Sequence, residues 1–342
     1  MIYCTKPMNK FPLLLLLLWA ATARGQKSPE VKAVLDSVVA HTERASLYRN
    51  KVDWPSLRAE VHQLAADADS IRKLGPAVKH LFAALGDEHA RLMHRNEQLA
   101  YFYGEPKEHL KLFNPEIYNR IQSGQEFTFL AQLIGERTGY VRIVGLPMGD
   151  NVAMSKAIQD PIQELQRNGA ENWIIDLRYD GGGNMFPMVE GLATVIGDGM
   201  VGGTSGLTET ESGVWKVMNG DFFYDDYSVA LPNDQVPGAL PKVAVLTSMY
   251  TVSSGEVVAV VFKGRESTRF FGEPTGGLTT ANDWTPLGES TALMVSTSVY
   301  KDRNGKVYTD FVDVDENFEF VPGQELNVDK AIIRATAWLN EL

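Results

Sequence analysis

A short polar turn in the second half of the chain carries residue types that suit nucleophilic chemistry. Residues 251–256 read Thr-Val-Ser-Ser-Gly-Glu, and apolar runs at 243–246 and 257–262 flank them. This pattern predicts a buried strand, a turn and a buried helix, with a serine at the helix N-terminus. Unpaired N–H groups and the positive end of the helix dipole stabilise negative charge there. An acyl-transfer nucleophile needs that environment, although a Ser-Ser-Gly turn also serves as an ordinary helix cap.

Two other segments could supply the remaining parts of such a site. Residues 85–89 read Leu-Gly-Asp-Glu-His, and His89 could act as a general base because the ordinary histidine pKa, about 6.5, suits proton transfer at neutral pH. Residues 176–183 read Asp-Leu-Arg-Tyr-Asp-Gly-Gly-Gly, a strand followed by a tight turn. Glycines let backbone N–H groups approach a substrate carbonyl closely, although the same run also suits a plain strand-to-helix turn.

The sequence contains no recognisable motif for binding a metal ion or a nucleotide phosphate. The six histidines all lie in the first third of the chain, and none forms the H-x-x-x-H or H-E-x-x-H spacing of a zinc site. The glycine run at 181–183 is not followed by the G-K-[ST] of a phosphate-binding loop. We therefore expect no cofactor and no metal ion.

Bulk composition indicates a globular, acidic protein. The chain has 342 residues, of which 44% are hydrophobic and 22% charged, and its net charge is −11. That length fits one large domain or a domain with an appendage. Because an acidic chain without a basic stripe binds nucleic acid poorly, we expect no nucleic-acid partner.

The first 25 residues are expected to be a secretory signal. Lys6 and Lys10 precede a short apolar run at 11–19, and small residues follow it. A basic segment, a short apolar core and an A-x-A site are typical of a cleaved signal peptide. The apolar run is about half of the roughly 20 residues that span a bilayer, which disfavours a membrane anchor. We predict cleavage after Ala23 or Gly25 and export to the periplasm or the extracellular space, without a stable membrane span.

Cysteine usage agrees with this interpretation. The only cysteine, Cys4, precedes the apolar core and is badly placed for lipid modification. The mature chain would therefore contain neither a disulfide nor a thiol nucleophile. A translation start at Met8 stays open as an alternative.

Hydrophobic spacing divides the rest of the chain into three parts. Residues 26–92 carry apolar residues at helical spacing and predict a domain of three or four helices. From residue 138 to 342, strands alternate with helices, as in a layered α/β domain. Residues 93–137 are rich in aromatic side chains and predict a cap or lid segment. The expected strands are 139–144, 173–177, 243–247, 269–272 and 293–300, and the expected helices are 155–168, 188–197, 255–264 and 329–339.

Four segments, taken together and in this order, resemble the tail-specific (C-terminal-processing) serine peptidase family. They are 85–92, 174–183, 251–277 and 316–322. The wider family includes the tricorn core protease and the interphotoreceptor retinoid-binding protein. The resemblance covers about residues 50–340 and implies an α/β fold with a Clp-protease/crotonase-like core and a helical N-terminal domain. A PDZ domain, common in this family, needs about 80 residues, and the roughly 50 between the histidine and residue 139 are too few.

The resemblance also implies roles for the serine and glycine turns. The family's nucleophile lies three residues before the glutamate that opens the next helix, which gives Ser253, with Ser254 as the adjacent alternative. The backbone N–H of Ser254 and one from Gly182 or Gly183 would then form the oxyanion hole.

The general base is where this chain departs from the bacterial C-terminal-processing proteases. Those proteases use a lysine after the Gly-Glu-x-Thr loop, but Leu278 stands at that position here. The tricorn-like branch uses a histidine instead, and the match to the family's L-x-D-x-H segment implies His89 as the base, with His94 as a weaker alternative.

The acid that would orient the imidazole is expected downstream of the serine. In the family it sits six residues before a proline, which gives Glu316, six before Pro322. The same branch can relay through a further hydroxyl, so direct contact with the histidine is not required. The close rivals are Asp313, Asp315 and Glu319.

These features predict an exported serine endopeptidase that hydrolyses peptide bonds in unfolded or extended polypeptides. The alternative is a non-catalytic protein that binds an apolar ligand or a peptide on the same fold. An esterase with the same triad is a weaker rival, and the chain does not contain the G-x-S-x-G elbow of α/β-hydrolases.

Overall fold

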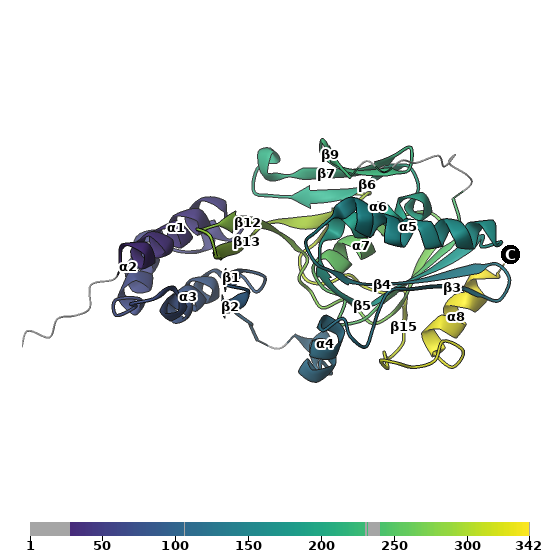
Figure 1. The fold of residues 1–342 in the computed structure, drawn as a ribbon, viewed down its shortest axis with the longest axis horizontal. Coiled ribbons are helices and arrows are strands. Elements are labelled where there is room, and N and C mark those ends of the chain that lie inside the picture. Colours follow the sequence, from purple (N-terminus) through teal and green to yellow (C-terminus); the bar gives the residue numbers. More distant parts are fainter. Residues whose placement is uncertain (1–27, 106, 230, 232–239, 342) are drawn as a thin grey trace, which may run out of the picture.

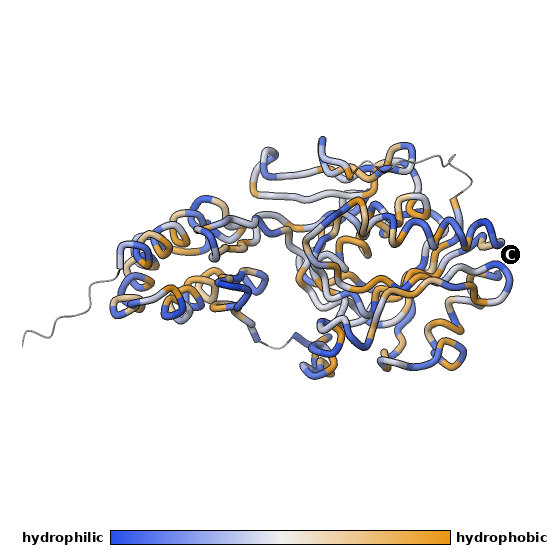
Figure 2. Tube along the Cα trace, viewed as in Figure 1, coloured by the Kyte–Doolittle hydropathy of each residue, from blue (hydrophilic) through white to orange (hydrophobic). Residues whose placement is uncertain are grey.

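The computed structural model describes residues 28–105, 107–229, 231 and 240–341, so the expected signal peptide lies outside the described residues. Figure 1 shows a helical N-terminal part at one end of the molecule and a larger layered α/β part at the other. The hydrophobic residues concentrate on the strands of the larger part and on the helices that cover them (Figure 2).

A six-stranded sheet, here called the central sheet, organises the larger part. Its strands are parallel except for β3, which pairs antiparallel with β4 at one edge. Parallel strands buried on both faces form continuous apolar runs, which explains the run at 243–246. The order across the sheet is β15 (Glu316–Asn317), β11 (Thr268–Gly272), β10 (Val243–Thr247), β5 (Asn172–Gly183), β4 (Thr138–Leu146) and β3 (Leu130–Ile134).

Helices cover both faces of the central sheet. Neighbouring side chains of a strand point to opposite faces, so Ile174 and Ile175 join different hydrophobic clusters. Ile175 packs in the cluster of α5 (Asn151–Arg167), α6 (Met185–Ile196) and α7 (Ser254–Phe262), whereas Ile174 packs in that of α8 (Lys330–Leu339).

A second, largely antiparallel sheet, here called the outer sheet, joins the two parts of the molecule. Its long strand β13 (Thr291–Asp302) pairs with β1 at Thr291–Met294 and with β6 at Val299–Asp302. One strand therefore holds both parts in register. The others are β1 (Arg91–His94), β2 (Glu97–Ala100), β6 (Gly199–Ser205), β7 (Gly213–Met218), β8 (Asp221–Tyr224), β9 (Tyr227–Ser228), β12 (Thr280–Pro286) and β14 (Val307–Tyr308).

The N-terminal part has its own hydrophobic core. Helices α1 (Pro29–Ala45), α2 (Trp54–Leu64) and α3 (Gly75–Leu85) pack together, and Leu293 and Val295 of β13 complete that core. Asp53 caps α2 by accepting the N–H of Ser56 at 3.2 Å. Between the two parts lie α4 (Pro115–Gln122) and the 3₁₀ turn Glu108–Leu110. The other 3₁₀ turns within the described residues are Arg49–Lys51 and Ile71–Leu74 in the N-terminal part and Glu209–Glu211 in the larger part.

The expected elements agree with these bounds to within a few residues, with three exceptions. Strand β5 runs to Gly183, six residues beyond the expected end at 177, so the glycines predicted to form a tight turn belong to the strand. Helix α5 begins four residues before the expected position because Asp150 caps it, accepting the N–H of Ala153 at 3.1 Å. Helix α6 begins three residues early because Asn184 caps it. The hairpins β6 to β9 were not expected, since short strands on a surface sheet carry weak periodicity. None of the helices within the described residues is long and apolar enough to cross a membrane.

One buried acid outside the serine turn makes stability depend on pH. Glu190 on α6 is fully buried, and its Oε2 accepts the N–H of Phe222 at 2.8 Å. Burial raises the pKa of Glu190 to about 7, and the neighbouring Asp221 adds to the rise.

We predict that Glu190→Gln flattens the pH dependence of stability. Between the ordinary pKa of 4.5 and about 7, only the folded state keeps the Glu190 proton. Glu190 should therefore lower the free energy of unfolding as pH rises through this window, by up to about 1.4 kcal/mol per pH unit. The variant should lose this contribution, while those of the buried Asp180 and Glu256 remain, and should unfold at higher urea than the parent at pH 8. Urea titrations at several pH values measure it, with exposed Glu164→Gln as control; equal slopes in parent and variant would contradict the assignment.

Candidate active site

Ser253 lies at a strained turn between β10 and α7. Its φ is +55° and its ψ is −117°, a backbone region that residues other than glycine rarely adopt. It precedes the first residue of α7, and its N–H donates to Oε2 of Glu256 at 2.9 Å. The predicted strand–turn–helix is confirmed, and the serine stands beside the unpaired N–H groups of the helix start.

The carboxylate of Glu256 ties three segments together. It is fully buried in the first turn of α7. Besides Ser253, it accepts the hydroxyl of Thr275 at 2.5 Å and the N–H groups of Gly277 and Leu278 at 2.9 and 2.8 Å. Burial raises its pKa to about 7, against the effect of these hydrogen bonds. Leu278, which stands where related enzymes carry a lysine, thus contributes its backbone to the site.

The glycines at 181–183, here called the glycine turn, are the last residues of β5 and lie directly against the serine. A Cβ on Gly182, whose φ is +92°, would come within 2.9 Å of the Ser253 Cβ. The hydroxyl of Ser254 donates to the carbonyl of Gly183 at 2.6 Å. Because that hydroxyl is engaged and buried, the geometry favours Ser253 over Ser254 as the nucleophile.

The N–H of Gly182 is not free in this structure. It donates to Oδ1 of Asp180 at 3.0 Å. Burial raises the pKa of Asp180 to about 7, although this hydrogen bond opposes the rise. Gly182 can serve an oxyanion, as the sequence suggested, only by sharing or exchanging that bond.

His89 is buried in the turn between α3 and β1, with only 8% of its surface exposed. Its Nδ1 lies 2.8 Å from the hydroxyl of Thr280. Burial lowers the pKa of His89 to about 3, the charge of Arg91 adds to this, and a hydrogen bond with the backbone of Thr280 opposes it. The imidazole is therefore neutral at neutral pH and able to accept a proton.

Two hydroxyl groups connect His89 to a buried carboxylate. The Thr280 hydroxyl lies 3.0 Å from that of Ser296, whose shortest hydrogen bond goes to Oδ1 of Asp87 at 2.7 Å. Asp87 also accepts the N–H of His89 at 3.1 Å, and burial raises the pKa of its carboxyl group. Sequence reasoning missed these partners, although Asp87 stands two residues before the histidine in the motif.

Residues 278–280 bring the serine and histidine segments to one place. The N–H of Leu278 is bonded to Glu256, which also holds Ser253. Thr280, two residues further on, is bonded to His89. Two residues of extended chain span about 7 Å, so both catalytic candidates border the same short segment.

Glu316 does not take the position expected of the orienting acid. It lies on β15, at the edge of the central sheet, and pairs with Arg269 at 3.0 Å and Arg334 at 2.9 Å. The prediction that Glu316 orients His89 disagrees with this geometry, because the hydroxyl relay from His89 ends at Asp87 instead.

The rival residues also have other partners. Asp313 pairs with Lys263 at 3.2 Å, and Asp315 accepts the N–H of Phe270 at 2.7 Å. Glu319 lies near Glu273. Burial is the main cause that raises the pKa of Glu273, and the negative charge of Glu319 raises it further. The Nδ1 of the alternative base, His94, lies 2.8 Å from the hydroxyl of Thr291.

Lys107 lies near the serine loops but is held as a cation. Its Nζ is 3.1 Å from carboxylate oxygens of both Glu88 and Asp310. Burial pulls its pKa down, yet the two carboxylates outweigh burial and raise it overall. A charged ammonium cannot accept a proton, so this lysine is no substitute base; it ties the segment of His89 to the larger part.

Helix α4, in the expected cap segment, touches the glycine turn. The side-chain amide of Gln122 donates to the carbonyl of Gly181 at 2.9 Å. Its role as a lid stays a prediction. No cluster of side chains suited to a metal ion occurs among the residues that the structure describes.

Comparison with known proteins identifies the family. The model of peptidase family S41 matches residues 137–320, which contain the glycine turn and Ser253. The chain therefore belongs to peptidase family S41 and is a serine peptidase, as its motifs predicted.

Individual relatives share parts of the chain or its fold. The nisin-resistance protein of Lactococcus lactis subsp. lactis is 31% identical over 147 residues, which are 43% of this chain and 46% of that protein. A lipoprotein from Streptococcus agalactiae has a TM-score of 0.67 at 18% identity, covering 92% of this chain and 97% of that one. The photosystem II D1 C-terminal processing protease has a TM-score of 0.54 at 17% identity, covering 90% and 97%. These structures confirm the expected α/β fold with a helical N-terminal region.

We predict that Gly182→Ala destabilises the protein more than Gly124→Ala does. Both glycines have positive φ, +92° and +62°, so both substitutions introduce backbone strain of about 1 kcal/mol. Only the Cβ at 182 collides with Ser253, whereas nothing lies within 4 Å at 124. Urea unfolding should show a clearly lower midpoint for the first variant. Equal urea midpoints for the two variants would mean that a Cβ at position 182 does not collide with Ser253.

Proposed function

We propose that the protein is an exported serine endopeptidase in which Ser253 is the nucleophile and His89 the general base. The observation that carries the proposal is the buried imidazole of His89, bonded to Thr280 in the segment that Glu256 ties to the strained serine turn. The signal-peptide pattern at 1–25 supports export to the periplasm or the extracellular space.

The hydrogen bonds define the tautomer that the mechanism needs. The Ser296 hydroxyl donates to Asp87, so it accepts from Thr280, and Thr280 in turn accepts from Nδ1–H of His89. The Nε2 atom then carries the lone pair. In this proposal Asp87, reached through two hydroxyls, replaces Glu316 as the group that orients the histidine.

In the acylation step, the Ser253 Oγ attacks the peptide carbonyl carbon and its proton moves to Nε2 of His89. The carbonyl oxygen becomes an oxyanion, which the N–H of Ser254 and one from the turn at Gly182 or Gly183 stabilise. The C–N bond then breaks, and the leaving amine takes the proton from Nε2. A water molecule, deprotonated by the same nitrogen, hydrolyses the acyl-enzyme and regenerates the serine.

The position of the site between the two parts of the molecule favours extended substrates. His89 comes from the end of the N-terminal part, and Ser253 comes from the larger part. A substrate must reach both, which suits an unfolded chain or a peptide better than a folded surface. The family resemblance supports the same substrate class.

We expect a fluorophosphonate probe to label the purified mature protein at Ser253. Ser253→Ala and His89→Ala should each abolish labelling, because one removes the nucleophile and the other its base. Matched controls are available in the neighbouring serine and in a second buried histidine. Ser254→Ala and His94→Ala should keep labelling, since the first hydroxyl is bonded to Gly183 and the second ring to Thr291.

The four variants separate the possible outcomes. Labelling that persists in Ser253→Ala would refute the nucleophile assignment. A folded parent that does not label would refute the proposed activity for this state of the protein and favour the binding-protein alternative. Far-UV circular dichroism shows whether each variant is folded.

We predict that Thr280→Val lowers kcat/KM for a peptide substrate by about a hundredfold. Valine keeps the branched shape but removes the oxygen that accepts from His89. Burial already lowers the His89 pKa, so the acid limb of the parent pH profile should lie below pH 6.5. The Thr280 interaction that opposes this lowering involves the Thr280 backbone, which valine keeps, so the acid limb should stay in place while the rate falls. Thr280→Ser should restore the rate; a Thr280→Val variant with the kcat/KM of the parent would count against the relay.

A further inference from the structure

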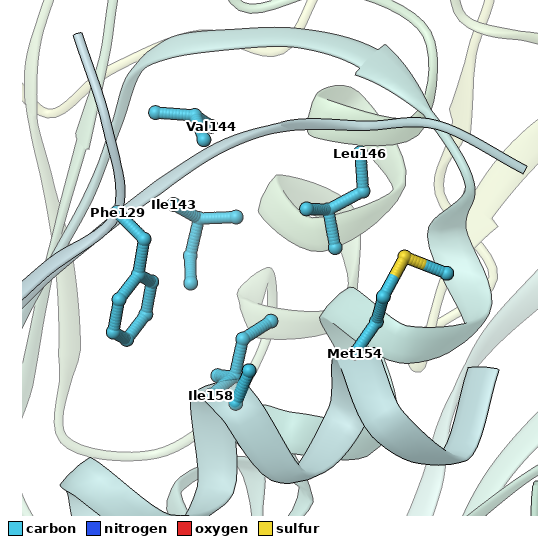
Figure 3. Close-up of a pocket in the computed structure, with 7 residues that line it drawn as sticks. Phe129, Ile143, Val144, Leu146, Met154 and Ile158 are labelled. Carbon is cyan, nitrogen blue, oxygen red and sulfur yellow. The ribbon is translucent and has the colours of Figure 1, made fainter. Parts of the chain in front are cut away.

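An apolar pocket lies between β4 and α5, beside the proposed active site. Its volume is about 120 Å³. Figure 3 shows Ile143 and Leu146 of β4 facing Met154 and Ile158 of α5 across it, with Phe129 at one side. All of its lining residues are apolar.

One residue of the pocket wall pairs with the glycine turn. Leu146, which lines it, is the register partner of Gly183 on β5, and the Leu146 carbonyl accepts the N–H of Asn184 at 2.8 Å. The carbonyl of Gly183 is in turn bonded to Ser254. Leu146 of the pocket wall and Ser254 of the serine turn are therefore both neighbours of Gly183.

The turn from β4 to α5 and the first turn of α5 also carry exposed apolar side chains. Met148 is 78% exposed and Val152 is 43% exposed, and both follow Leu146 closely in the chain. Exposed apolar side chains that adjoin an apolar pocket are typical of a ligand-binding surface. A substrate backbone passing along the glycine turn could place one side chain over this surface and into the pocket.

We propose that this pocket is a substrate subsite that takes one aliphatic or small aromatic side chain within a residue or two of the scissile bond. The proposal rests on the proposed peptidase function, because it identifies which side chain that site selects. The size supports it: an apolar cavity of about 150 Å³ holds a benzene molecule. A polar or charged side chain would lose its hydration there without gaining a hydrogen-bond partner.

Ala157 offers a way to fill the pocket without disturbing the core. It lines the pocket from α5 yet is exposed, so a larger side chain there need not displace buried groups. Ala153 is exposed on the same helix and is not among the lining residues, which makes Ala153→Leu the matched control for Ala157→Leu.

The test uses fluorogenic peptides that differ at one position at a time, with leucine, phenylalanine, serine or aspartate. At one position near the cleaved bond, the parent should prefer leucine over serine by about tenfold or more in kcat/KM. Ala157→Leu should reduce that ratio to near one, and Ala153→Leu should leave it unchanged. Met154→Ala, which enlarges the pocket, should shift the preference toward phenylalanine.

Labelling by the fluorophosphonate probe separates the two proposals. If Ala157→Leu labels at the parent rate but keeps the leucine preference, the subsite is refuted and the peptidase mechanism stands. The subsite is refuted in the same way if the parent labels but shows no apolar preference at any position. If the parent neither labels nor cleaves, the proposed function fails and the subsite fails with it.

Discussion

The site depends on one buried carboxylate, that of Glu256. It accepts hydrogen bonds from Ser253, Thr275, Gly277 and Leu278, and so joins the serine turn to the loop that leads into β12. A buried carboxylate without partners would be very unfavourable, whereas one with several donors fixes their positions. The strained backbone at Ser253 persists because these bonds, together with the packing of α7, leave it no relaxed alternative.

The second requirement is that two separate parts of the chain share a strand. The first residues of β13 pair with β1, next to His89, and its last residues pair with β6 in the larger part. Ser296, between these two pairings, supplies a hydroxyl of the relay to Asp87. The strand that holds the two parts together thus also carries a link in the orientation of the histidine, so any shift between the parts would change the distance from base to nucleophile.

Much of this arrangement could be predicted from the sequence, because motifs and periodicity are local. The segments of Ser253 and His89, the glycine turn and the α/β alternation all follow from short stretches. The relay could not be predicted, since Thr280 and Ser296 are ordinary strand residues whose role arises only from the pairing of β12 with β13. The spacing of Glu316 from a proline contains no information about Arg269 and Arg334, which hold its carboxylate in the structure.

Burial of the site explains why the relay must end at a carboxylate. A dry pocket lowers the pKa of His89 and raises those of Asp180 and Glu256, because it disfavours every charged form. Such an environment keeps the imidazole neutral and ready to accept a proton, but it also opposes the imidazolium that forms during catalysis. Burial also raises the pKa of Asp87, but hydrogen bonds from Ser296, His89 and Ala90 oppose that rise and favour its carboxylate form. This carboxylate, reached through two polarisable hydroxyls, offsets the penalty as positive charge develops. The low-dielectric environment that keeps the imidazole neutral also favours an apolar substrate side chain in the pocket at Leu146. Both the histidine base and the pocket therefore require that the substrate exclude water from the site when it binds.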